Sequence, residues 1–292
     1  MPEDSLYEWF EDSDMNDTLT VGGKGASLGE MYQQLSKLGV KVPNGFTLTT
    51  AAFQKFINAD IPDKTWNNVG APEGMEQLRQ TAIESNTLAG ALEVCLRDAD
   101  PSDHLNLNGR AQLARSLVRE TPVPDDIKQV IASEYGKLCD IYHPGVDVAV
   151  RSSATTEDSA EASFAGQYES FLNVSGDTDI IEKWRRCVAS MFTERAIGYH
   201  LEHNMHPLDS AIAVVVMKMA RSDKACSGVM FTIDPDSGHD GVIHIGSSYG
   251  LGELVVQGVV SPDTYTVWKE GLRAGKFPIV HRTLGAKDQM MV

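Results

Sequence analysis

The pattern of apolar residues changes once along this chain, near residue 205, and this change limits the folds that the chain can adopt. Residues 60–143 have helical periodicity over most of their length. After Pro207 the chain instead consists of short β-branched runs separated by turn residues. These runs predict strands at 211–219, 228–234, 241–247 and 264–268. We therefore predict a mixed α/β (α+β) fold of two lobes, 1–205 with a helical segment at about 60–143 and 206–292 rich in strands.

Two further segments before residue 205 have clear local patterns. Residues 146–151 form a β-branched run, which predicts a buried strand. Residues 180–203 form the clearest helical pattern in the chain, and we expect one continuous helix there.

The charge and cysteine content of the chain restrict its partners. The formal net charge of −16 argues against general nucleic-acid binding, although a nucleotide needs only a few well-placed cations. No run approaches the ~20 apolar residues of a membrane span, and the acidic N-terminus lacks the apolar core of a signal peptide. The four cysteines form no CxxC pair, which argues against a zinc site and a disulfide framework. We therefore expect a cytoplasmic protein with no membrane or nucleic-acid partner.

The segment Gly22–Ser27, GGKGAS, comes directly before a predicted helix. Glycines let backbone N–H groups approach an anion, a helix N-terminus attracts negative charge, and Lys24 supplies a point charge. The GxxxxGKS/T spacing of a Walker A loop is absent, and a glycine-rich helix start is more often structural than functional. The helix that follows has apolar residues at helical spacing, namely Leu28, Met31, Leu35 and Leu38.

Arg151 is predicted to end the strand at 146–151, and Ser152 and Ser153 follow it. The planar guanidinium can hold two phosphate oxygens, and two hydroxyl groups beside it suit a polyphosphate. The alternative is a surface arginine in a salt bridge, and the local sequence does not choose between the two.

Two more segments have both a functional and a structural interpretation. Residues 162–167 lie in a long loop of small residues, which either closes over phosphates or simply connects two elements. Glu253 follows a strand and the tight turn Gly250-Leu251-Gly252. A carboxylate in that place either accepts hydrogen bonds from ribose hydroxyls or is exposed to solvent.

Taken together and in this order, the segments resemble the nucleotide-binding region of phosphoenolpyruvate synthases, in the family that includes pyruvate phosphate dikinase. The resemblance covers most of residues 17–292, although 60–143 matches poorly. The matching segments are VGGKGASLGEM, VPNGFTLTTAAF, VAVRSSATTEDSAEASFAGQYESFLNV, RAIGY, RSDKACSGVMFTIDPDSG, GLGELVVQGVVSPDTY and RTLGAKDQMMV.

The resemblance implies an ATP-grasp-like fold, in which two lobes hold ATP between them, and a phosphotransferase reaction. The β-phosphoryl group of ATP would pass to a histidine on a mobile domain and then to pyruvate on a third domain. The products would be phosphoenolpyruvate, AMP and phosphate. Those two domains would be the partners of this chain, and the full-length enzyme would form a homodimer.

The same resemblance implies roles for individual residues. Lys24 and Arg151 match the phosphate-binding cations of the family, which would hold ATP and stabilise charge as the phosphoryl group moves. Gly166 and Ser170 match the loop over the phosphates. A threonine is usual at the position of Ser170, and the change keeps the hydroxyl group.

The base and the ribose would be bound by later segments. Met217 to Met219 match the strand that lines the adenine, and Glu253 matches a position suited to the ribose. Relatives commonly carry a glutamine at the position of Met217, so a polar contact to the nucleotide is lost there.

The chain ends at Val292, before the family's next segment, an acidic residue followed by a Gln-x-Arg-Pro strand that supplies Mg²⁺ ligands. We therefore expect a fold truncated at its C-terminal end, with no metal ligands of its own and Mg²⁺ bound beyond the chain. None of the eight histidines has the surroundings of the family's phosphorylated histidine, so we expect this fragment alone to be inactive.

Two alternatives stay open at this point. The chain is the same region of a rifamycin phosphotransferase or another dikinase, since the part that binds the acceptor lies outside it. Otherwise it is a non-catalytic module that kept the fold and lost nucleotide binding, against which the presence of Lys24, Arg151 and Glu253 together argues.

Overall fold

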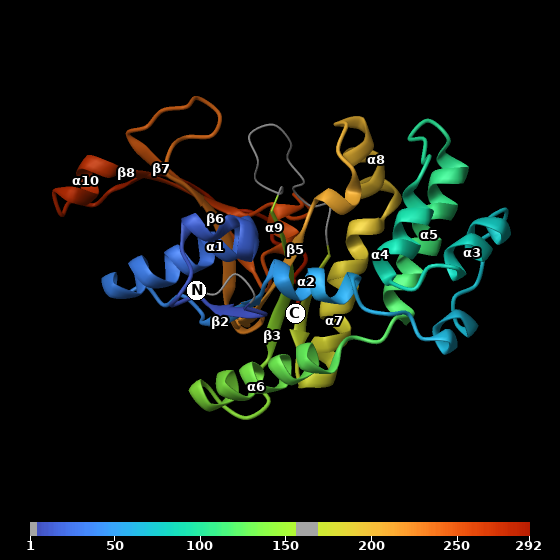
Figure 1. Ribbon diagram of the computed structural model, residues 1–292. Coiled ribbons are helices and arrows are strands. Elements are labelled where there is room, and N and C mark those ends of the chain that lie inside the picture. Colours follow the sequence, from blue (N-terminus) through green and yellow to red (C-terminus); the bar gives the residue numbers. More distant parts are fainter. Residues whose placement is uncertain (1–4, 156–168) are drawn as a thin grey trace. The chain divides into compact units, whose positions relative to one another are not determined.

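A computed structural model of the chain describes residues 5–155 and 169–292 (Figure 1). The chain forms two compact units, Met1–Met219 and Ala220–Val292. This division falls later than the predicted boundary near 205, because the strand Ile212–Lys218 lies within the sheet of the first unit. The assignment of the units as ATP-grasp lobes stays a prediction.

The first unit contains a five-stranded antiparallel sheet with the order β1-β2-β5-β3-β4. Its strands are β1 Tyr7–Trp9, β2 Gly45–Leu48, β3 Val148–Ala154, β4 Ser170–Val174 and β5 Ile212–Lys218. β5 occupies the centre and is apolar over most of its length, as expected for a strand with neighbours on both edges and elements on both faces.

Eight α-helices of the first unit belong to the described residues, and four of them lie in the segment 60–143 that was predicted to be helical. They are α1 Thr18–Leu35, α2 Thr50–Ile57, α3 Glu76–Ile83, α4 Leu88–Leu96, α5 His104–Glu120, α6 Asp125–Ile141, α7 Asp177–Ala189 and α8 Glu194–Glu202. Figure 1 shows α3, α4 and α5 gathered at one side of this unit.

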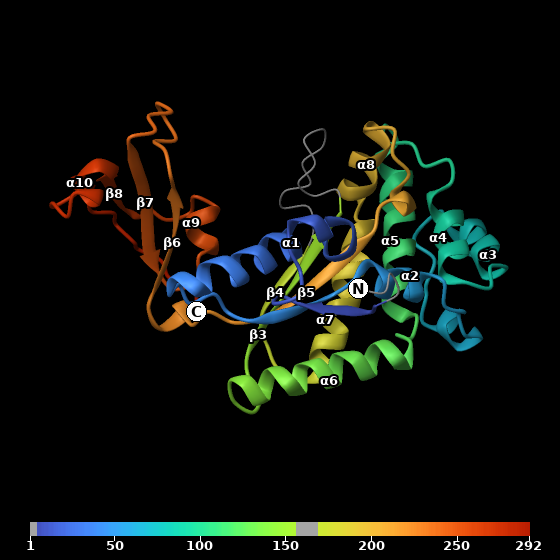
Figure 2. The ribbon, with the colours of Figure 1, turned by 60° about the vertical axis from the view of Figure 1, so that its left-hand side comes forward.

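The two faces of the first sheet are covered by different helices. Val148 and Val150 of β3 and Val214 and Val216 of β5 are fully buried members of the main hydrophobic core, and α7 packs on these strands. Because side chains alternate along a strand, the residues between these valines lie on the opposite face. α1 packs on that opposite face, so the sheet separates α1 from α7 and α6 (Figure 2).

The predicted helix over 180–203 is interrupted. α7 ends at Ala189, a short 3₁₀ helix spans Ser190–Phe192, and α8 starts at Glu194. The Thr193 hydroxyl accepts a hydrogen bond of 3.2 Å from the Ala196 N–H and so caps the new helix. The prediction of one continuous helix was therefore wrong, because this cap lies inside an otherwise unbroken periodic pattern.

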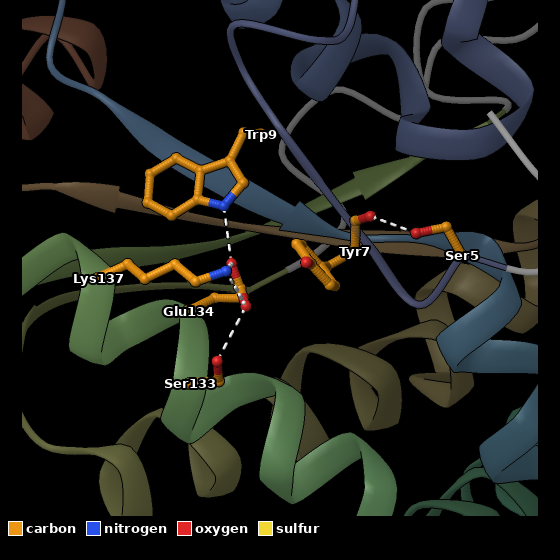
Figure 3. A network of polar contacts seen from close by, with 6 residues as sticks. All are labelled: Ser5, Tyr7, Trp9, Ser133, Glu134 and Lys137. Carbon is orange, nitrogen blue, oxygen red and sulfur yellow. Dashed lines mark hydrogen bonds and ion pairs between the residues drawn. The ribbon is translucent and has the colours of Figure 1, made fainter.

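A buried carboxylate joins β1 to α6. Glu134 accepts a hydrogen bond of 2.8 Å from the indole N–H of Trp9 and two of 2.9 Å from the Lys137 ammonium, as Figure 3 shows. The Ser133 hydroxyl donates a further bond of 3.1 Å. A buried charge is tolerated only when it is paired and hydrogen-bonded, and this network meets both conditions.

The second unit is a four-stranded antiparallel sheet with the order β6-β7-β8-β9. Its strands are β6 Cys226–Phe231, β7 Val242–Tyr249, β8 Asp263–Trp268 and β9 Ile279–Thr283. Two short helices accompany the sheet, α9 Glu253–Val256 and α10 Lys269–Arg273. α9 lies in the connection between β7 and β8 and packs against β6.

Within the residues that the structure describes, no helix has both the length and the apolar character needed to cross a membrane. The four cysteines are free thiols, and two of them, Cys95 and Cys187, are buried in the core of the first unit.

Candidate nucleotide site

The glycine-rich segment is a break inside α1. Gly22 has φ +71° and ψ 170°, so a first helical turn ends there and a second helix starts after it. A Cβ atom at Gly22 would lie 2.1 Å from the carbonyl oxygen of Ser153. Only glycine allows both this left-handed φ and this approach of α1 to the backbone of β3.

The side chain of Ser153 holds this break in place. Its hydroxyl donates a hydrogen bond of 2.8 Å to the Val21 carbonyl and accepts one of 3.0 Å from the Gly25 N–H. The two partners lie on either side of Gly22, so Ser153 satisfies two backbone groups that the break removes from the helix. The local sequence offers Ser153 only as a hydroxyl suited to a polyphosphate, and no local pattern indicates this structural role.

Lys24 is fixed against the same strand. Its ammonium donates a hydrogen bond of 3.0 Å to the Ser152 carbonyl, and the residue is partly buried. The sequence separation of 128 residues shows that the packing of α1 on β3 brings the two together. The charged end of Lys24 therefore contacts the residue of β3 that directly follows Arg151.

Arg151 lies in the middle of β3 rather than at its end, because the strand continues to Ala154. It pairs with Val215 of β5 and with Ser170 of β4. Within 5–155 and 169–292 the structure gives the Arg151 guanidinium no hydrogen bond and no ion pair. The salt-bridge alternative for Arg151 thus has no support among these residues.

Four predicted residues come together on the α1 side of the first sheet. Arg151 alternates with the core residues of β3, and its cross-strand partner Ser170 therefore shares its face. Met217 of β5 pairs with Ala149, two residues before Arg151, and shares the face as well. Lys24 comes to this face on α1. Directly opposed side chains on one face stand about 5 Å apart at Cβ, so Arg151 and Ser170 can contact one group.

The other predicted residues are placed differently. Met219 follows the end of β5, is buried, and donates its backbone N–H to the Asp147 carbonyl at 2.9 Å. Glu253 belongs to the second unit, where it is the first residue of α9 and is partly buried. Gly166 lies outside the described residues.

The two hydroxyl groups after Arg151 are not available as predicted. Ser153 is occupied by Val21 and Gly25, as described above. Ser152 shares the core face of β3 with Val150, and its hydroxyl is buried without a hydrogen-bond partner in the part of the chain that is described. The interpretation of the two serines as hydroxyls beside a phosphate therefore gains no support, because Ser152 points into the core and Ser153 holds the break in α1.

The described residues do not form a metal site of their own. No group of three His, Cys, Asp or Glu side chains that could hold a metal ion is found among them. The donors on the α1 side of the sheet are instead an ammonium, a guanidinium and a hydroxyl. Groups of this kind attract anions, and the planar fork of an arginine in particular matches the oxygens of a phosphate.

Residues 18–292 match the family described as "Pyruvate phosphate dikinase, AMP/ATP-binding domain". The chain belongs to this family, and its fold is a mixed α/β fold of the ATP-grasp-like nucleotide-binding type. The predicted fold class and family are thereby confirmed.

Curated relatives are phosphoenolpyruvate synthases. One from Synechocystis sp. is 43% identical over 295 residues, which are 99% of this chain and 33% of that protein. One from Aquifex aeolicus is 39% identical over 289 residues, with 99% of this chain and 31% of that protein covered. One from Escherichia coli is 39% identical over 287 residues, with 98% and 33% covered. The chain thus spans about a third of the length of these relatives.

Proposed function

We propose that this chain is the ATP-binding part of a phosphoenolpyruvate synthase, that is, a pyruvate, water dikinase. In the proposed reaction the β-phosphoryl group of ATP passes to a histidine on another domain and then to the enol oxygen of pyruvate. Water takes up the γ-phosphoryl group as phosphate, and AMP is released. Membership of the AMP/ATP-binding family and the names of the relatives support this proposal.

One observation in the structure carries the proposal furthest. Lys24 and Arg151, which are 127 positions apart in the sequence, are brought to neighbouring positions on one face of the first sheet. The partly buried Arg151 has no counter-ion among the described residues. Burying part of a charged guanidinium without a partner costs free energy, and an anion such as a polyphosphate offsets that cost.

Each residue has a role in the proposed site. Lys24 and Arg151 bind phosphate oxygens and offset the charge that shifts between them during transfer. Ser170 and Gly166 belong to the segment over the phosphates. Met217 and Met219 line the adenine, and Glu253 accepts hydrogen bonds from the ribose hydroxyls.

The setting of the reaction is part of the same proposal. Mg²⁺ would accompany ATP as its counter-ion, since the described residues offer no metal site of their own. Four free thiols fit a reducing compartment, so we propose the cytoplasm. The phosphohistidine and pyruvate-binding domains of a longer, homodimeric enzyme would be the partners, with a place in gluconeogenesis.

The alternatives receive less support. The relatives found are phosphoenolpyruvate synthases, which favours pyruvate over rifamycin as the final acceptor. A module without nucleotide binding has no need for an arginine that lacks a counter-ion among the described residues and lies beside a fixed lysine.

Titration of ATP–Mg²⁺ into the purified chain by calorimetry tests the proposal. We compare the wild type with Arg151→Ala and use Arg97→Ala as the control, because Arg97 is exposed at the end of α4. We expect Arg151→Ala to weaken binding at least about tenfold, as loss of a charge-assisted bond does, and Arg97→Ala to bind like the wild type. Equal affinity of all three proteins, or no binding to the folded wild type, contradicts the proposed site.

A further inference from the structure

The last residues of the second unit run back across both ends of the connection between β7 and β8. At the first end the Leu251 N–H donates a hydrogen bond of 2.8 Å to the Met291 carbonyl, and Gly250 forms a parallel β-bridge with Met291. Gly250 has φ +77°, and a Cβ atom there would lie 2.2 Å from the Met291 oxygen. The backbone of Met291 and the side chain of Met290 are therefore packed directly on the start of the connection.

At the second end the contacts centre on Asp263, the first residue of β8. Its Oδ1 accepts the backbone N–H of Gly285 at 2.9 Å and forms an ion pair with the Lys287 ammonium. The Lys287 backbone N–H donates to the Ser261 carbonyl at 3.3 Å. The Lys287 ammonium also lies 5.9 Å from the centre of the Tyr249 ring, at the end of β7.

The Lys287 side chain thus contacts residues at both ends of the connection. Its side chain is only 9% exposed, although a lysine normally keeps its ammonium in water. The segment 285–291, which we name the strap, holds the connection 250–263 closed by backbone bonds at one end and by this ion pair at the other.

The connection between these two ends carries two buried apolar side chains. Leu251 and Val260, at 5% and 4% exposure, are its buried apolar side chains. Glu253 lies between them as the first residue of α9. A four-residue helix has almost no stability of its own, so the position of Glu253 depends on how the connection is held.

We propose that Lys287 is a positioning residue for the nucleotide, which fixes Glu253 for the ribose hydroxyls by holding the connection 250–263 through Asp263. This inference rests on the ribose-binding role proposed above for Glu253. It assigns a function to two segments, GLGELVVQGVVSPD and RTLGAK, whose link is visible only in the structure.

The holding role is tested without any nucleotide by amide hydrogen exchange. We expect Lys287→Met to raise exchange in residues 251–260 at least about tenfold, since loss of the pair leaves Asp263 partly uncompensated. Peptides covering β5 in the first unit should exchange as in the wild type. Lys276→Met is the matched control, because Lys276 is an exposed lysine of the same unit whose side chain forms no hydrogen bond or ion pair with the described part of the chain. Unchanged exchange in Lys287→Met overturns the inference.

The positioning role is tested by comparing ATP with 2′,3′-dideoxy-ATP, which lacks both ribose hydroxyls. We expect the wild type to prefer ATP by about tenfold, the factor that one hydrogen bond to a charged group supplies. Lys287→Met and Glu253→Gln should both remove this preference, leave dideoxy-ATP affinity unchanged, and add nothing to each other when combined. Lys287→Arg should restore it.

The outcomes separate this inference from the proposed function. ATP binding with a preference that survives in Lys287→Met overturns the positioning role while the ATP site stands. A wild type that binds ATP and dideoxy-ATP equally overturns the role of Glu253 and the inference with it. A folded wild type that binds neither nucleotide overturns the proposed function itself, and hydrogen exchange still decides whether the strap holds the connection.

Discussion

The hydroxyl of Ser153 accepts a hydrogen bond of 3.0 Å from the backbone N–H of Gly25, 128 residues earlier in the chain. The same hydroxyl donates to Val21 at 2.8 Å, so one side chain on β3 spans the break in α1 at Gly22. This relationship determines where Lys24 lies relative to Arg151.

Replacing Ser153 by alanine should therefore lower the free energy of unfolding more than a substitution on the surface does. The change leaves the buried Gly25 N–H and the Val21 carbonyl without partners, and we expect a loss of about 1–3 kcal/mol in the free energy of unfolding. Urea unfolding measures this loss. Ser36→Ala, at an exposed serine after α1, should change stability by less than about 0.5 kcal/mol. Equal effects of the two substitutions would show that the Ser153 bonds contribute nothing.

Replacing Gly22 by alanine should destabilise the protein, whereas replacing Gly136 by alanine should stabilise it. At Gly22 alanine meets both the left-handed φ and the backbone oxygen of Ser153 at 2.1 Å, so we expect a loss of at least about 2 kcal/mol. At Gly136, inside α6, a Cβ atom meets nothing within 4 Å. There alanine should stabilise the helix by about 0.5–1 kcal/mol. Thermal or urea unfolding of the two variants shows whether each substitution raises or lowers the free energy of unfolding. Stabilisation by Gly22→Ala would contradict the described break in α1.

Trp9→Phe tests the network of Figure 3. The substitution keeps an aromatic ring on β1 but removes the 2.8 Å hydrogen bond to Glu134, so we expect a loss of about 1.5–3 kcal/mol beyond the effect of the smaller ring. Trp66→Phe is the control, because Trp66 is also buried and the structure gives its indole N–H no partner among the described residues. Chemical unfolding of both variants compares them. A loss no larger than that of Trp66→Phe would mean that the bond is not stabilising.

Glu8 should make the stability of the first unit depend on pH. Burial, together with the nearby carboxylates of Asp17, Asp12 and Asp14, raises the pKa of Glu8 from 4.5 to about 7. The folded state then binds the proton more tightly than the unfolded chain. The contribution of Glu8 is therefore complete below pH 4.5 and is lost as the pH rises through 7.

Glu8→Gln removes this titration. The full difference in pKa corresponds to about 3 kcal/mol, so the variant should be more stable than the wild type by up to that amount at pH 8. At pH 4, below the ordinary pKa of 4.5, the two proteins should agree within about 0.5 kcal/mol. Urea unfolding at both pH values provides the comparison, with the exposed Glu73→Gln as a control that should show no such pH-dependent gain. The same difference in stability at pH 4 and pH 8 would rule out a shifted carboxyl.

Local patterns predicted the elements better than their ends. The β-branched run at 146–151 predicted β3 but not its extension through two serines to Ala154, because serine is neutral to strand formation and only pairing with β5 and β4 continues the strand. The pattern over 180–203 likewise hid the cap at Thr193. The apolar repeat at 28–38 predicted the helix α1 correctly, but it did not mark the buried face, since Met31 and Leu38, the latter in the 3₁₀ turn after α1, are 39% and 78% exposed. The buried face of α1 instead consists largely of small residues, which lets the helix lie close to the sheet.

The sequence by itself determined the family of this protein and its mixed α/β class, and it singled out Lys24 and Arg151 as candidate phosphate-binding cations. Side-chain type and the order of motifs are local properties, so they can be read without coordinates. Only the tertiary structure decided which groups meet. It placed Ser153 on the break in α1, turned Ser152 into the core, and paired Lys287 with Asp263. Each of these depends on which side of a strand or connection faces a segment distant in sequence, and packing of the whole unit sets that choice.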